Sequence, residues 1–255
     1  MIFKTRPGIA KQFATEHDFG FKNLIVSGCS FTYNNHDTAA VTWPYYLKDL
    51  GGFEQVLDSS MPGAGNHHIS NSLQWALENH RPDIKDSLVI VMWSGNDRDD
   101  YICPRANTTA YPFEFCYDVD VVSGITGGSS ADSRGNTNNI FKEFSKTKTA
   151  KSRAVENYLH ILNLWNYLMV NGYKFVFLDY LDRSVASRTQ DFDLAQCLPA
   201  GPKTQLDSMI TKLVTPHEWA IRHDQLSSDD FHPSPKGYLE WTRRALLPYL
   251  KTQID

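Results

Sequence analysis

Apolar and polar residues follow one another along the chain in blocks that predict buried strands separated by amphipathic helices. Apolar runs at 23–27 and 87–93 end in small residues, a pattern typical of strands buried on both faces of a parallel sheet. Shorter runs at 53–57 and 173–178 predict two further strands. Between and after these strands, helices are predicted over residues 43–50, 66–79, 154–170 and 236–250.

This alternation predicts an α/β fold, in which helices cover both faces of a parallel sheet. Residues 1–255 are expected to form a single domain, because no linker or internal repeat divides them. In sheets of this kind, ligands bind at the carboxyl ends of the strands. We therefore expect the functional residues in four segments that meet there: 27–32, 59–65, 94–98 and the loop before the last helix.

The stretch from about 98 to 150 departs from this rhythm. It contains 123–130 and 135–139, which are rich in Gly, Ser, Asn and Thr and predict a loop. A connection of roughly 50 residues is far longer than usual, which favours an insertion that acts as a lid or a binding element. The alternating aromatic residues within it predict a small hairpin strand: Tyr111, Phe113, Phe115 and Tyr117.

Composition excludes several classes of protein. The formal net charge of −4 does not favour nucleic acid or an anionic membrane surface as a partner, since both require a basic patch. No apolar run of about 18 residues is present, so no membrane span is expected. The first residues resemble no signal peptide, and the four cysteines form no CxxC pair. We expect a cytoplasmic protein with reduced thiols, with a Cys103–Cys116 disulfide as the alternative; its oligomeric state is not indicated.

A candidate nucleophile follows the first predicted strand. Gly28, Cys29 and Ser30 form a tight turn there, which presents a serine hydroxyl beside a glycine. The segment lacks the Gly-x-Ser-x-Gly elbow, because residue 32 is Thr, and it lacks the Gly-Lys-Ser/Thr of a phosphate loop. Cys29 is a rival nucleophile. Because it directly precedes Ser30, its side chain is expected to point to the other side of the chain, which favours a buried thiol.

A serine nucleophile needs a base, and the base needs a group that orients it. Asp229 stands three residues before His232, a spacing that presents both side chains on one side of a turn. The carboxylate then holds one ring nitrogen while the other faces the serine. Asp230 is a rival orienting group, and the alternative interpretation is a surface aspartate near an unrelated loop histidine.

Two further segments supply candidate oxyanion donors. Asn96 follows the strongest predicted strand, where its amide can donate to a developing oxyanion. Gly63 follows the second strand and offers a backbone N–H to the same oxygen. The structural alternatives are an Asx-turn at Asn96 and a simple turn before a helix for which Asn66 is the N-cap.

These four segments, in this order, resemble the four conserved blocks of the SGNH (GDSL-like) hydrolase family. The resemblance implies a three-layer α/β/α sandwich with a parallel, flavodoxin-like sheet, interrupted here by the insertion at about 98–150. It assigns Ser30 as nucleophile, His232 as its base and Asp229 as the residue that orients this base. Ser30, Gly63 and Asn96 are assigned to the oxyanion hole. Two residues depart from the family pattern, namely Cys29 before the nucleophile and Asp58 in the second block.

The resemblance implies a serine ester hydrolase that uses no cofactor and no metal. His67, His68 and His217 offer no zinc-ligand spacing, and the histidine pair is expected to be exposed on its helix. The polar insertion favours a short acyl group, such as acetyl, on a carbohydrate or small ester as substrate. The alternatives are an acyltransferase that uses the same triad and a non-catalytic carbohydrate-binding protein on this fold.

Overall fold

The computed structural model of the protein is built around one parallel sheet with strand order β2-β1-β3-β6. The strands are β1 (Asn23–Gly28), β2 (Gln55–Asp58), β3 (Ser87–Trp93) and β6 (Lys174–Asp179). The chain passes from β1 to its neighbour β2 and then crosses to β3 on the other side of β1, so its direction of winding reverses between β1 and β3. The structure describes residues 12–33, 41–95, 98–104, 119–125, 149–180, 200–228 and 232–254.

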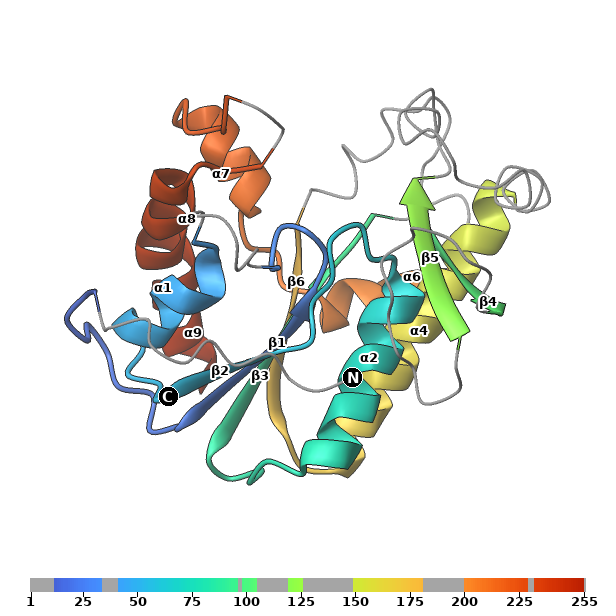
Figure 1. The fold of residues 1–255 in the computed structure, drawn as a ribbon, viewed down its shortest axis with the longest axis horizontal. Helices are drawn as coiled ribbons and strands as arrows, with labels where there is room; N and C mark the ends of the chain where they lie inside the picture. The colour runs from blue at the N-terminus through green and yellow to red at the C-terminus, as the bar shows by residue number, and fades with distance from the viewer. Residues whose placement is uncertain are drawn as a thin grey trace.

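Helices cover both faces of this sheet (Figure 1). One face carries α1 (Trp43–Leu50) and a continuous C-terminal helix made of α8 (Pro235–Trp241), the π-helical turn η3 (Thr242–Leu246) and α9 (Leu247–Ile254). The other carries α2 (Asn66–His80) and α4 (Ala150–Val170), with α6 (Ala200–Met209) packed against α4. The short helix α7 (Pro216–Arg222) packs against α8. In the described part of the chain, no helix is both long and apolar enough to span a membrane.

These layers confirm the predicted α/β/α sandwich with a parallel sheet. The observed order matches the first four strands of the flavodoxin-like arrangement. The segment after α6 extends the β6 edge, because the Thr211 backbone N–H donates to the Phe177 carbonyl at 3.0 Å. In this arrangement ligands bind where the winding reverses, which places the expected site beyond the carboxyl ends of β1 and β3.

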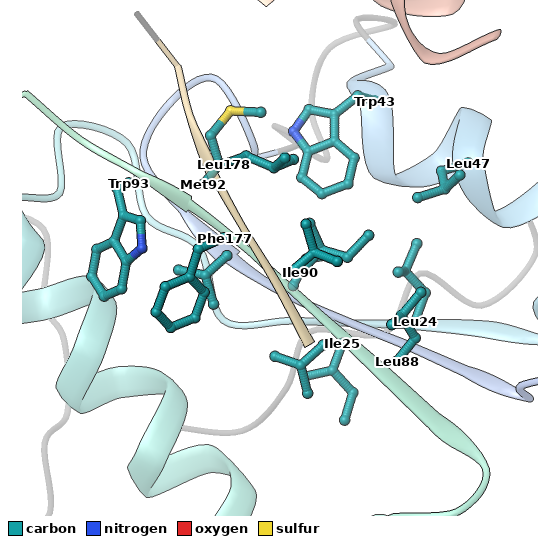
Figure 2. Packing of buried hydrophobic residues seen from close by; sticks show 14 of the residues in the cluster. Leu24, Ile25, Trp43, Leu47, Leu88, Ile90, Met92, Trp93, Phe177 and Leu178 are labelled. Atoms are coloured by element: carbon teal, nitrogen blue, oxygen red, sulfur yellow. The ribbon is translucent and has the colours of Figure 1, made fainter. Parts of the chain in front are cut away.

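The core lies on both faces of the sheet, as the continuous apolar runs predict. Figure 2 shows Met92 and Leu178 pointing toward Trp43 of α1, with Trp93 and Phe177 on the opposite face, on the side of α2. The rings of Trp93 and Phe177 meet edge to face, with centroids 5.1 Å apart. Neighbouring residues of a strand point to opposite faces, so a strand covered on both sides buries every residue. Trp43 and Trp93 are both completely buried, so both belong to this core.

Most element boundaries lie within a few residues of those predicted. The largest differences are at the last helix, which ends at Ile254 rather than at 250, and at α4, which begins at Ala150 rather than at 154. Thr149 explains this earlier start, because its hydroxyl accepts the Ser152 backbone N–H at 3.1 Å and so satisfies a donor of the first turn.

The structure corrects one part of the predicted insertion. Arg98–Pro104 forms strand β4, which pairs antiparallel with β5 (Val119–Ile125), so residues 123–125 lie in a strand and not in the predicted loop. The valines of β5 favour this pairing, and ladder hydrogen bonds outweigh the local preference of Ser123 and Gly124 for turns. The aromatic residues of the predicted hairpin strand, and residues 126–148, lie outside the described residues.

Candidate active site

Ser30 lies on a tight turn directly after β1. The Cys29 carbonyl accepts the backbone N–H groups of Thr32 and Tyr33, both at 2.9 Å, and this folds the chain back beneath the serine. Ser30 itself is partly exposed, whereas Cys29 is completely buried. The turn therefore presents the serine hydroxyl outward and buries the neighbouring thiol in the core.

Gly28 enables this turn because the chain packs closely around it. A β-carbon at Gly28 would lie 2.2 Å from the Thr32 hydroxyl oxygen and 3.1 Å from the Met92 carbonyl oxygen. Thr32 is fully buried, so it has little room to move away. Only a residue without a side chain leaves the Ser30 turn in this position against β3.

We therefore expect Gly28→Ala to lower the free energy of unfolding by about 1–3 kcal/mol, the usual cost of overpacking a core. Gly201→Ala in α6 is the matched control, because nothing lies within 4 Å of a β-carbon built there. That control is expected to be neutral or stabilising by up to about 1 kcal/mol. Urea unfolding of the two variants measures both effects, and equal midpoints would contradict the crowding at Gly28.

A β-bridge and a backbone hydrogen bond close the loop that carries His232 and hold it in place. Leu226 and Pro233 form an antiparallel bridge, and the Ser227 backbone N–H donates to the His232 carbonyl at 2.8 Å. Ser234 then caps α8 through its hydroxyl, which accepts the Gly237 N–H at 3.1 Å. The loop of His232 is thereby anchored on α7 at one end and on α8 at the other.

The fold brings Ser30 and His232 into direct contact. The Ser30 Oγ and the His232 Nε2 lie 2.7 Å apart, within hydrogen-bonding distance. This contact lies just past the carboxyl end of β1, where the fold predicts a ligand site. A histidine nitrogen at this distance is placed to accept the serine proton, which is the geometry that a serine nucleophile requires.

Phe31 packs against this histidine and so fixes its orientation. Its ring packs on the His232 imidazole, with centroids 4.4 Å apart and planes inclined by 36°. Tyr180, directly after β6, packs on Phe31 at 4.6 Å, and His217 of α7 meets it edge to face at 6.1 Å. Because Phe31 is itself buried, the imidazole packs against an aromatic ring that has little freedom to move.

Gly63 lies in the loop that continues β2 alongside the Ser30 turn. The backbone N–H groups of Ser59 and Met61 donate to the carbonyls of Val26 and Gly28, at 2.9 and 3.0 Å. These bonds carry the ladder between β1 and β2 past the ends of both strands. Gly63 has φ +78°, a left-handed conformation that glycine adopts without strain.

Asp58, which departs from the family pattern, shapes the start of this loop. Its carboxylate accepts the Ser60 backbone N–H at 2.8 Å and also the Ser60 hydroxyl. This is an Asx-turn, in which the aspartate side chain stands in for a backbone acceptor.

Two predicted site residues, Asn96 and Asp229, lie outside the described residues, as does the rival Asp230. On either side of Asn96, Ser94 and Gly95 are buried just after β3, and Asp100 is buried in β4. The described site therefore contains the Ser30–His232 pair and the Gly63 loop.

One prediction about α2 is wrong, and one structural alternative for its first turn differs from the structure. His68 was expected to be exposed, but its side chain faces inward and is only 2% exposed. Asn66 is not the N-cap of α2; Gly65 occupies that position, and the Asn66 side chain turns inward to bond Ser94. Within the described ranges, no three His, Cys, Asp or Glu residues gather in a cluster able to hold a metal ion.

Sequence patterns indicated no role near this site for four residues: Phe31, Asn66, Asp100 and His217. Phe31 follows Ser30 directly, and an aromatic residue beside a candidate nucleophile is the signal that points to it. Asn66 follows a Gly-rich strand end, which identifies it only as a helix start. Asp100 and His217 carry no local signal, because their contacts lie far away in the chain.

No family model matches the chain, and no curated protein matches it. Solved structures are similar to it, including the following two. A candidate acylhydrolase from Bacteroides fragilis is 11% identical, covers 94% of this chain and 91% of its own, and superposes with a TM-score of 0.42. The psychrotrophic esterase EstA from a Pseudoalteromonas species, in a structure inhibited by monoethylphosphonate, is 12% identical, with 91% and 98% covered and a TM-score of 0.48.

Proposed function

We propose that this protein is a serine ester hydrolase of the SGNH type. The observation that carries the proposal is the 2.7 Å contact between the Ser30 Oγ and the His232 Nε2 beyond the carboxyl end of β1. A partly exposed serine paired with a histidine on a parallel sheet is suited to attack an acyl carbonyl.

In the proposed mechanism, the Ser30 oxygen bonds to the acyl carbon of the ester while His232 takes the serine proton. The tetrahedral oxyanion accepts hydrogen bonds from the Ser30 and Gly63 backbone N–H groups and from the Asn96 amide. Asp229 holds the second imidazole nitrogen and fixes the tautomer. His232 then gives its proton to the departing alcohol, leaving an acyl group on Ser30.

Water completes the reaction by the same route. His232 removes a proton from the water as its oxygen attacks the acyl carbon, and the Ser30 oxygen departs and recovers that proton. The products are a carboxylic acid and the free enzyme. We propose a short acyl group, such as acetyl, on a carbohydrate or small ester as the substrate, based on the polar composition of residues 123–139.

Labelling with a fluorophosphonate probe tests this function, because the probe phosphonylates an activated serine and releases fluoride. We expect covalent labelling that peptide mass spectrometry locates at Ser30. A folded protein that takes up no label, while binding a carbohydrate, would be the non-catalytic binding protein. Ester cleavage that yields a new ester with an added sugar, in preference to free acid, would identify an acyltransferase.

Hydrolysis is expected to be independent of metal ions. The proposed mechanism uses only side chains and backbone N–H groups of the protein, so it has no step for a metal to assist. Dialysis against EDTA should leave the rate of p-nitrophenyl acetate hydrolysis unchanged within error. A loss of activity that added zinc or calcium restores would contradict the mechanism.

A further inference from the structure

The N-terminus of α2 joins the two loops that carry the proposed oxyanion donors. Gly63 lies two residues before Gly65, the N-cap of this helix. The other loop leaves β3 at Ser94 and enters β4 at Arg98, so it contains Asn96. Two buried side chains tie that second loop to the start of α2, one on each side of Asn96.

The first tie is made by Asn66, which is 1% exposed. Its Oδ1 accepts the Ser94 backbone N–H at 2.8 Å, and its Nδ2 donates to the Ser94 carbonyl at 3.1 Å. The second Nδ2 hydrogen goes to the Asn157 Oδ1 of α4, at 2.8 Å. The Asn66 amide thus bonds both backbone polar groups of Ser94, as a neighbouring strand would, and fixes the position and orientation of this residue.

The second tie is made by Asp100 of β4, which is 9% exposed. One carboxylate oxygen accepts the Gly65 backbone N–H at 2.8 Å and the other accepts the His68 N–H at 2.7 Å. N–H groups at a helix start lack partners within the helix, and the positive end of the helix dipole favours a carboxylate there. Gly65 has no side chain with which to cap α2, so β4 supplies the cap.

Close packing shows that this cap is tightly fitted. A β-carbon at Gly65 would lie 2.6 Å from an Asp100 carboxylate oxygen, so any larger residue would displace this carboxylate from the start of α2. Asn66 and Asp100 together hold the chain two residues before and four residues after Asn96.

We propose that Asn66 and Asp100 are positioning residues: they fix the chain on either side of Asn96, at Ser94 and in β4, against the start of α2 that follows Gly63, and so align the two proposed oxyanion donors. This inference rests on the proposed ester hydrolase function and deepens it. Both side chains are buried, so neither is expected to touch the substrate. Both act through the start of α2, so their loss should weaken binding of the transition state more than binding of the substrate.

The test uses two substitutions that keep the size of the side chain. Asn66→Asp retains an acceptor for the Ser94 N–H but removes both donors, and Asp100→Asn replaces one of two acceptors with a donor. For p-nitrophenyl acetate we expect each to lower kcat by about 10- to 100-fold, with KM within about twofold of wild type, because aligned oxyanion donors act in the transition state. The affinity for phenylboronic acid, which forms a tetrahedral adduct with an activated serine, should fall in parallel with kcat.

Two matched controls carry the same changes elsewhere. Asn79→Asp lies at the other end of α2, where its side chain is exposed, and Asp86→Asn lies before β3 in an exposed ion pair with Lys22. Both are expected to keep the wild-type kcat, KM and boronate affinity.

The outcomes separate this inference from the proposed function. Wild-type protein that neither hydrolyses the ester nor takes fluorophosphonate at Ser30 refutes the proposed function. With an active wild type, a folded Asn66 or Asp100 variant whose kcat stays within about twofold, or whose KM alone rises, refutes the positioning role. If both variants unfold, Asn157→Ala is the deciding variant, because it removes the acceptor of one Asn66 amide hydrogen. A fall in kcat of about three- to tenfold with constant KM supports the positioning role, and an unchanged kcat overturns it.

Discussion

The Ser30→Ala variant is expected to lose ester hydrolysis by a factor of about 10³ or more in kcat while remaining folded. The loss follows from the proposed covalent step, because alanine offers no oxygen to bond the acyl carbon. The fold should persist because the turn is held by backbone bonds to the Cys29 carbonyl, whereas the serine hydroxyl points outward and bonds to His232. Initial rates with p-nitrophenyl acetate, together with urea unfolding, measure the two parts.

Cys29 provides the control for this experiment. Its thiol is completely buried, so Cys29→Ala should keep hydrolysis and Ser30→Ala/Cys29→Ala should be as inactive as Ser30→Ala alone. Retention of more than about one part in a hundred of the activity in the double variant would exclude Ser30 as the nucleophile, because loss of a true nucleophile costs far more.

The His232→Gln variant is expected to lose activity to a similar extent, about 10³-fold or more in kcat. Glutamine keeps a polar group near the Ser30 hydroxyl but cannot take up its proton. Since nucleophile and base act as one unit, the Ser30→Ala/His232→Gln double variant should be no worse than either single variant. Comparison of kcat/KM for the three proteins tests this dependence, and multiplicative losses would show that the two residues act separately.

His223→Gln is the matched control, because this histidine is exposed at the end of α7 and stacks on Trp219 at 4.3 Å. It lies nine residues before His232 in the sequence and outside the Ser30 contact. The control should keep the wild-type rate. A similar loss in both histidine variants would point to damage in the α7 region rather than to a missing base.

The sequence alone determined the layers of this fold and the candidate pair of reactive residues. The runs at 23–27 and 87–93 predict buried strands, because a strand covered on both faces must be apolar at every position. Strand ends of a parallel sheet share one edge, so the short motifs at Ser30 and His232 were expected to meet although they are far apart in the chain. The structure brings them to hydrogen-bonding distance.

Only the tertiary structure decided how these loops are supported. Residues 123–125 look like a loop locally, and pairing with β4 makes them a strand. The burial of His68 and the contact of Phe31 with His232 depend on elements remote in the sequence. Local patterns report the backbone periodicity of a segment, whereas its partners are chosen by long-range packing.

The start of α2 illustrates the same limit. Gly65 and Asn66 at a strand end predict a helix start, and either residue type suits its N-cap. Asp100 determines which residue becomes the N-cap. Its carboxylate, in β4, caps the helix, so the Asn66 side chain bonds Ser94 instead. A cap supplied from β4 leaves no trace in the sequence around the helix, because its partner is 35 residues away along the chain.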